Sequence, residues 1–329
     1  MSNLAWSWRN AAFGALISSV AVIVIIFGEV ENGINLLIGA IPAAILGLPP
    51  RRSDRRRVMI IGMLFAGSVL VGSVMAQWAP VAVVGMFLMG LGASLLATRR
   101  TLGYAVLTIC LPLAATGLTF DGLDESGGVS VLFLTGSAIA FAVALCFPDY
   151  DDPEPVGPPL LTVTAAQRYG VRLGLAAAVA TAIAFYYAAE HTGWIVISTV
   201  IVMRPTEEMM KVRSAGRAVS VFIGALVAAW LLSVDLSPSA IAVVGAGAII
   251  AASATNASRW YITPAFTTFL ILWSVLYSNP TTENISYRSW ERVIDTLIGV
   301  GIAYFFGLLV PTLSRRHAAA PSATPPTPV

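Results

Sequence analysis

Cysteine, histidine and charge are scarce in this chain of 329 residues. It has two cysteines and two histidines, and only 11% of its residues are charged, whereas soluble domains average about 25%. Cys110 and Cys146 lie in apolar runs, with no CxxC or Cys/His cluster, so neither a disulfide framework nor a metal site is predicted. His191 and His317 are far apart in sequence, and there is no Ser-His-Asp pattern, P-loop or GxGxxG turn. We therefore expect no enzyme, no cofactor and no nucleic-acid partner.

Apolar residues are abundant instead, at 57% of the chain. They recur in runs, most of them near the 17–25 residues that cross a bilayer as a helix. The predicted spans are 10–28, 33–48, 58–77, 80–97, 101–118, 130–147, 169–188, 192–203, 218–234, 237–254, 260–277 and 291–311. This pattern predicts an all-α polytopic membrane protein with about twelve transmembrane helices.

Positive charge is placed on alternate connections between these runs. With the N-terminus in the cytoplasm, all but two of the 19 Lys and Arg fall on the cytoplasmic side. The exceptions are Arg288 and Arg292, and the outer loops are acidic. Because positive residues favour the cytoplasmic side, we expect both termini inside and a multi-pass protein of the plasma (inner) membrane.

Two of the runs, 33–48 and 192–203, are short. The first contains Pro42, and the second stops at Arg204-Pro205. If either run returned to the outer side, an arginine cluster would land there, so both are interpreted as short or broken crossings. Such segments need protein or water around them rather than lipid, which places both near a pore or cavity.

The order of long spans, short spans and basic turns is repeated. With a period of about 160 residues, six spans follow six in a parallel repeat. We expect a first repeat at 1–147, a Pro-rich acidic cytoplasmic linker at 148–160 (starting PDYDDPEP), a second repeat at 161–314 and a disordered tail at 315–329.

Two groups of charged residues are candidate site residues. Arg204, Arg213 and Arg217 follow the second short run; they either orient the spans or form a cytoplasmic vestibule that attracts anions. Arg292 and Asp295 open the last span, three residues apart on one helical face. They form either a structural ion pair or a functional pair, in which Arg292 contacts an anion or Asp295 relays protons.

Several of these residues carry a family resemblance. The segment Gly193-Trp194, Arg204-Pro205, Arg213, Arg217, Gly224 resembles the short span and elbow of the fusaric acid resistance (FUSC-like) family, which includes aromatic acid exporters. The segment RVIDTLIG, from Arg292 to Gly299, is also similar to that family. Ser220 and Val221 stand where the family usually has Gly-Thr. The resemblance covers residues 168–311 and extends distantly to aluminium-activated malate channels.

The resemblance implies export or passive conduction of organic anions, typically aromatic carboxylates. Arginine suits such a substrate because its planar guanidinium binds carboxylates with two hydrogen bonds, and Trp194 offers a ring for stacking. The expected partners are a small organic anion and the lipid bilayer, and the chain is expected to act as a monomer or homodimer.

Two other classes remain open. Twelve spans in two halves also suit a major-facilitator-type secondary transporter, and RRSDRRR at 51–57 follows the second span, where that superfamily has a basic loop. A membrane scaffold subunit that transports nothing would explain the lack of a catalytic set, but not the charged pair inside the last span.

Overall fold

The twelve predicted apolar segments all contain helix. The computed structural model describes residues 5–98, 106–120, 122–151, 162–187, 191–232, 234, 236–256, 262–277 and 282–310. The helices are α1 (Trp8–Ile26), α2 (Val30–Leu46), α3 (Arg52–Ala76), α4 (Ala79–Leu96), the π-helix η1 (Val106–Cys110), α6 (Leu111–Gly117), α7 (Leu123–Cys146), α8 (Val163–Tyr186), α9 (Gly193–Val202), α10 (Glu207–Leu232), α11 (Pro238–Ala254), α12 (Ile262–Tyr277), α13 (Thr282–Tyr304) and the π-helix η2 (Phe305–Leu309). No β-strand occurs among these described residues.

Seven of the helices are long and apolar enough to cross a membrane: α1, α3, α4, α7, α8, α10 and α13 with η2. Much of their apolar surface faces outward, with Ile23, Val84 and Val131 more than half exposed. Exposed apolar surface of this extent is costly in water and ordinary in lipid, where helices pack without a hydrophobic drive between them. The chain is therefore a multi-pass helical membrane protein.

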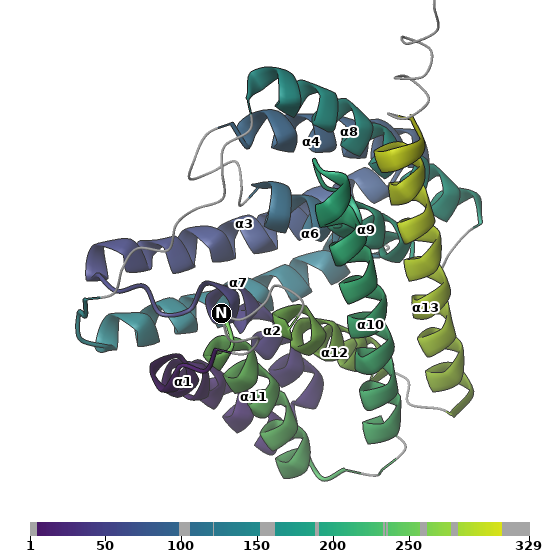
Figure 1. Cartoon of the computed structure of the whole chain (residues 1–329). Coiled ribbons are helices and arrows are strands. Elements are labelled where there is room, and N and C mark those ends of the chain that lie inside the picture. Colours follow the sequence, from purple (N-terminus) through teal and green to yellow (C-terminus); the bar gives the residue numbers. More distant parts are fainter. Residues whose placement is uncertain are drawn as a thin grey trace, which may run out of the picture.

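The short helices α2 and α9 lie at the centre of the molecule (Figure 1). Every residue of α9 except Ile201 is buried, and α2 is buried along most of its length. Helix α2 packs against α1, α7, α11 and α12, while α9 packs against α6, α8, α10 and α13. Both short segments thus have protein around them, as predicted.

Glycine permits the closest contacts of these central helices. A methyl group on Gly39 of α2 would lie 2.6 Å from the Phe133 carbonyl oxygen of α7, and one on Gly299 of α13 would lie 2.6 Å from the Ile195 carbonyl oxygen of α9. Small residues let helix backbones approach in this way. The glycines therefore allow α7 to pack closely against α2, and α13 to pack closely against α9.

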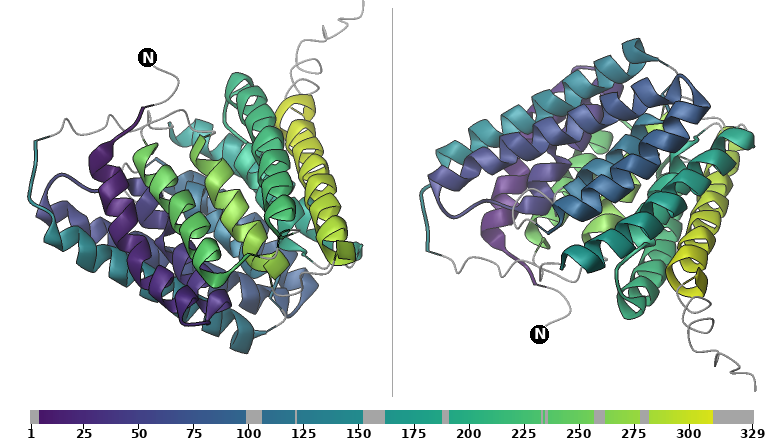
Figure 2. Two further views of the ribbon diagram at one scale, coloured as in Figure 1. Left: turned by 90° about the horizontal axis from the view of Figure 1, so that it is seen from below. Right: turned by 90° about the horizontal axis from the view of Figure 1, so that it is seen from above.

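Two further helix pairs form long seams, α4 with α8 and α1 with α11 (Figures 1 and 2). Gly90 of α4 meets Gly174 of α8, and the Ser94 hydroxyl donates to the Ala166 carbonyl at 2.6 Å. In the second seam Gly14 lies against Ile250 and Ser253. Each seam joins a helix of residues 1–147 to one of residues 161–314.

Several helices begin earlier than the apolar pattern predicted. Helix α10 starts at Glu207, although the predicted span started at 218. The extra turns are charged, and Glu207 pairs with Lys211 at 2.7 Å, four residues on. Acidic residues in a first turn and such i,i+4 pairs stabilise a helix beyond its apolar part. The elbow predicted from Arg204 to Arg217 is therefore mostly helix, and only residues 203–206 join α9 to α10.

Pro42 does not break its segment. Helix α2 runs through Pro42 to Leu46, and Gly47 follows with φ of 71°. A proline removes one backbone hydrogen bond and its ring presses on the preceding turn, but here it stands near the helix end. Of the linker predicted at 148–160, only residues up to 151 are described; the predicted tail at 315–329 lies outside the described residues.

Candidate functional site

Helix α13 carries four charged side chains on one face. Arg288, Glu291, Arg292 and Asp295 are spaced i, i+3, i+4 and i+7, which places them on one stripe rising about 10 Å along the helix. Helix α13 packs against α9 and α10, and in Figure 2 it runs beside α10. The stripe faces the interior, because Arg292 and Asp295 are only 3% and 6% exposed.

Arg292 and Asp295 share this face without pairing. No ion pair joins them in the part of the chain that the structure describes, and Nη1 of Arg292 and Oδ2 of Asp295 are buried without a hydrogen-bond partner. The direct ion pair considered from their spacing is therefore absent. A buried N–H or carboxylate oxygen without a partner costs free energy, so these two atoms are the candidate contacts for a bound group.

Arg217 reaches the same region from α10. It lies about three turns from the start of the helix and is 5% exposed. Its Nη1 donates to Oγ1 of Thr268 on α12 at 3.1 Å, while its Nε has no partner. Its positive charge is close enough to act on the charge of Arg292. Arg217 was assigned to the cytoplasmic elbow, and the early start of α10 explains why it is buried instead.

Trp194 stands at the start of α9 beside this cluster. The Arg292 guanidinium carbon lies 4.8 Å from the centre of the Trp194 ring, and the His191 ring stacks on Trp194 with centroids 4.1 Å apart. The ring is only 3% exposed. Trp194 was expected to stack a substrate ring, but in this structure it is covered by protein and holds Arg292 through a cation–π contact.

A second polar group adjoins the first at the start of α13. His191 Nδ1 and Arg288 Nη1 each lie 3.2 Å from Oε2 of Glu291, and these two nitrogens are also 3.2 Å apart. The three side chains are between 10% and 20% exposed. These three residues were not among the predicted site residues. The spacing of charges along α13 was the available signal for Arg288 and Glu291, and no pattern linked His191 to them.

Arg204 and Arg213 lie at the other end of α9. Arg204 is 6% exposed and its Nη1 donates to the carbonyls of Val200 and Met203 at 3.3 and 2.9 Å. The Tyr169 hydroxyl donates to the same Met203 carbonyl at 2.9 Å, and Arg213 is close enough to act electrostatically on Tyr169. A cation at a helix C-terminus satisfies its free carbonyls. The structure thus gives Arg204 a capping contact, about 15 Å along α9 from Trp194.

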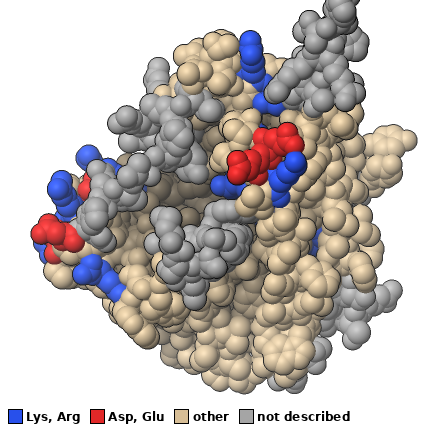
Figure 3. Space-filling model, in the orientation of Figure 1, with Lys and Arg blue, Asp and Glu red and all other residues tan. Residues whose placement is uncertain are grey.

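The six predicted residues therefore divide into two groups. Trp194 and Arg292 are in contact near the start of α9, and Arg217 and Asp295 are close enough to Arg292 for their charges to interact. Arg204 and Arg213 lie near the end of α9. On the face shown in Figure 3, charged side chains gather near the start of α3 and near the start of α10, while the lower part is largely uncharged.

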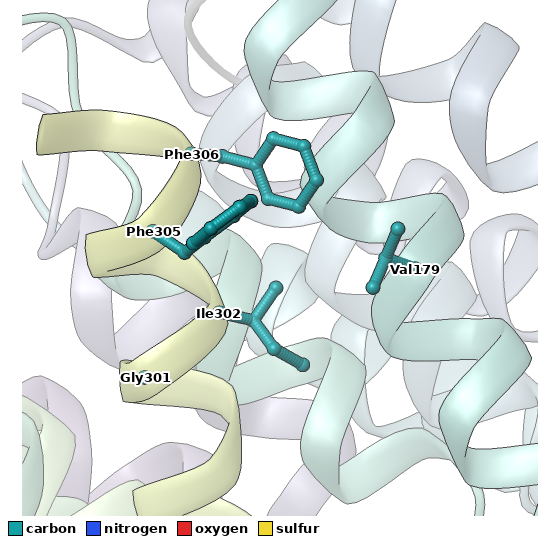
Figure 4. A pocket seen from close by; sticks show the side chains of 5 residues that line it. All are labelled: Val179, Gly301, Ile302, Phe305 and Phe306. Atoms are coloured by element: carbon teal, nitrogen blue, oxygen red, sulfur yellow. The ribbon is translucent and has the colours of Figure 1, made fainter. Parts of the chain in front are cut away.

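A pocket of about 370 Å³ lies elsewhere, between α8 and the end of α13. Val179 lines it from α8, and Gly301, Ile302, Phe305 and Phe306 line it from α13 and η2 (Figure 4). Its lining is apolar, and Val179 and Phe305 are exposed on the outer surface. The pocket suits hydrocarbon, and it does not include the charged cluster.

The fold and the buried charged cluster define a multi-pass membrane protein with polar chemistry in its interior. Residues 177–306 match the model of the family described as fusaric acid resistance protein-like. The match confirms the predicted resemblance, and its range contains helices α9 to α13 and the whole cluster. The similarity to malate channels stays a prediction. No curated protein and no solved structure matches the chain.

Proposed function

We propose that this chain carries small organic carboxylate anions, aromatic ones among them, across the plasma (inner) membrane. The observation that supports the proposal most directly is the burial of both Arg217 and Arg292, near enough to each other for their charges to interact. Both guanidinium groups are buried and both keep an N–H without a partner. Two like charges that are buried together repel each other, and an anion between them relieves both the repulsion and the missing hydrogen bonds.

The charge of the whole cluster also favours a single anion. Three guanidinium groups stand against two carboxylates, which leaves one positive charge when His191 is neutral: the residues are Arg217, Arg288, Arg292, Glu291 and Asp295. A substrate with one carboxylate neutralises this excess. Charged groups inside a membrane protein commonly mark ion or substrate pathways, and Asp295 serves here as the internal counter-ion when no substrate is bound.

We further propose that the chain crosses the membrane twelve times as two parallel six-helix repeats with both termini in the cytoplasm. The helix contacts support this arrangement. The seam of α1 with α11 corresponds to that of α4 with α8, α2 with α7 corresponds to α9 with α13, and α3 with α6 corresponds to α10 with α12. In this arrangement α2 and α9 are equivalent helices on either side of a pseudo-two-fold axis along the membrane normal.

The other predicted residues take supporting roles in this proposal. Trp194 holds Arg292 in place through its ring. Arg204 and Arg213, at the far end of α9, attract anions to the cytoplasmic mouth by their charge. Because both repeats belong to one chain, a monomer supplies every residue of the site.

The test is flux into vesicles of neutral lipid that contain the purified full chain. We expect uptake of radiolabelled benzoate and hexanoate above that of empty vesicles, and no uptake of benzyltrimethylammonium, an aromatic cation. Arg217→Gln should remove the benzoate flux, whereas Arg168→Gln, which changes an exposed arginine of α8, should leave it unchanged. Equal uptake by empty and protein-containing vesicles for every acid would overturn the proposal.

A further inference from the structure

Glu291 is a carboxylate that already sits in a built carboxylate-binding site. Its Oε2 is 3.2 Å from the guanidinium of Arg288 and 3.2 Å from Nδ1 of His191. Its side chain is 10% exposed and that of His191 is 11% exposed. A guanidinium and an imidazole that converge on one carboxylate oxygen would hold the carboxylate of a free molecule in the same way.

We propose that Arg288 and His191 form an entry site for organic carboxylates, and that Glu291 occupies it as a tethered competitor which the substrate displaces. This inference rests on the proposed function and adds a second anion position to the same pathway. The buried pair Arg217 and Arg292 is called the inner site. The entry site is one helical turn from it, because Arg288 and Arg292 are four residues apart on α13, a rise of about 6 Å. A carboxylate released by Arg288 therefore has Arg292 as its next partner.

The contacts of His191 explain why Glu291 can be displaced. Nδ1 of His191 is 3.2 Å from both the Glu291 carboxylate and Nη1 of Arg288. A single ring nitrogen donates when it carries the proton and accepts when it does not, so it cannot bond both neighbours at once. In either state one of the two contacts is left without its hydrogen bond. When Nδ1 carries no proton, Glu291 therefore keeps only the hydrogen bond from Arg288 of these two contacts.

The displacement of Glu291 would also affect Arg292, because the side chains between them are in contact. The His191 ring stacks on Trp194, and Trp194 contacts the Arg292 guanidinium. The charge of Glu291 also acts on that of Arg292. When a substrate replaces Glu291, the negative charge near Arg292 is that of the substrate carboxylate, which can move, instead of the Glu291 carboxylate, which is fixed to α13. The two sites are thus joined through one stack of three side chains.

A binding measurement on a variant without Glu291 separates a competitor role for this residue from a purely structural one. If Glu291 only clamps the start of α9 to α13, its loss loosens the site and benzoate binds equally well or more weakly. If Glu291 competes for the site, its loss frees Arg288 and His191, and benzoate binds more tightly. A tethered group acts at a high effective concentration, so the expected gain is large.

The experiment is equilibrium dialysis of radiolabelled benzoate against the purified full chain in detergent. We expect Glu291→Gln to bind benzoate about tenfold more tightly than the wild type, since a competitor at millimolar effective concentration has been removed. The double variant Arg288→Gln/Glu291→Gln should lose this gain. The matched control is Glu31→Gln, an exposed carboxylate near the start of α2, which should bind as the wild type does.

Gel filtration and thermal unfolding report whether each variant is folded. If Glu291→Gln does not fold, Glu291→Asp replaces it, because the shorter side chain reaches the site less well and should also bind benzoate more tightly. Folded variants that bind benzoate no more tightly than the wild type overturn the entry site. Flux through wild-type vesicles is measured separately, so a failure of transport and a failure of the entry site are told apart.

Discussion

Two settings of buried arginine can be compared in this molecule. Arg55, near the start of α3, is fully buried, and its nitrogens donate to the carbonyls of Pro49, Phe147 and Pro148, with the Asp149 carboxylate 3.2 Å away. Arg292 is buried to nearly the same degree but keeps an N–H without a partner. Burial is thus shared by both residues, and only the supply of acceptors separates them.

The comparison extends to the two halves of the chain. In the first half the interior face of α7 is neutral, and its Ser130 and Ser137 donate to the carbonyls of Ala66 and Gly39. In the second half α13, which the proposed repeat equates with α7, carries Arg292 and Asp295, each with a buried polar atom that has no hydrogen-bond partner. The polar groups of α7 that are named here are therefore partnered, whereas two of those on α13 are not. A binding site for a charged molecule needs buried polar atoms that are not already bonded to the protein.

Among the changes that test this comparison, Arg292→Gln has the largest expected effect, and the effect is on transport. This change removes a buried charge that has few partners, so the protein should fold, while benzoate flux into vesicles should fall about 100-fold, the equivalent of roughly 3 kcal/mol of lost anion stabilisation. The measurement is initial flux divided by the amount of folded protein. Flux near the wild-type level would place Arg292 outside the pathway and remove the contrast with Arg55.

Arg55→Gln should show the opposite profile. The change leaves several carbonyls and Asp149 without their donor, so the free energy of unfolding should fall by about 3 kcal/mol. Thermal unfolding in detergent measures the loss. Flux per folded molecule should stay at the wild-type level, and Arg57→Gln, which changes a half-exposed neighbour, should alter neither quantity. A specific loss of flux in Arg55→Gln would show that a fully partnered arginine also serves transport.

Asp295→Asn tests the internal counter-ion. Removal of its negative charge leaves the two guanidinium groups with a larger positive excess, so benzoate should bind more tightly and leave more slowly. Flux should fall about tenfold, which corresponds to about 1.4 kcal/mol. Dialysis and flux are measured on the same preparation. Weaker binding together with lower flux would instead show that Asp295 holds the site in shape.

Trp194→Leu should have the smallest effect. It removes the cation–π contact with Arg292, which is worth on the order of 1 kcal/mol, so flux should fall about fivefold. The matched control is Trp273→Leu, which changes a buried tryptophan that packs against Phe269 on α12. Flux is compared at equal amounts of folded protein. An equal loss in both variants would assign the effect to packing alone.

The helices were predictable because apolar runs of sufficient length dictate them. Their beginnings were not, because the charged first turns of α10 and α13 are helical without being apolar. The burial of Arg217 was missed for the same reason. It was assigned to the cytoplasmic elbow because it precedes an apolar run, but α10 starts ten residues before it and carries it into the protein.

Part of the site was predictable from sequence for a similar reason. Arg292 and Asp295 were found because charge inside an apolar run is rare. The polar contacts of Glu291 were missed because one of its partners, His191, is 100 residues away. The arginines at 51–57 were interpreted as cytoplasmic charges, and two of the acceptors of Arg55, the carbonyls of Phe147 and Pro148, come from residues 92 and 93 positions along the chain. Such partners are set by the packing of helices, which local sequence does not contain.

The shortness of α9 has an electrical consequence. Ten residues of helix rise only about 15 Å, half of a hydrocarbon core about 30 Å thick. In the proposed topology, the transmembrane voltage then falls over a shortened insulating layer beside Trp194 and Arg292. An anion that passes along α9 would cross most of that voltage in one short step, which is worth about 2.3 kcal/mol per 100 mV for each charge. Its movement would therefore be recorded as a current, and the rate would change steeply with membrane potential.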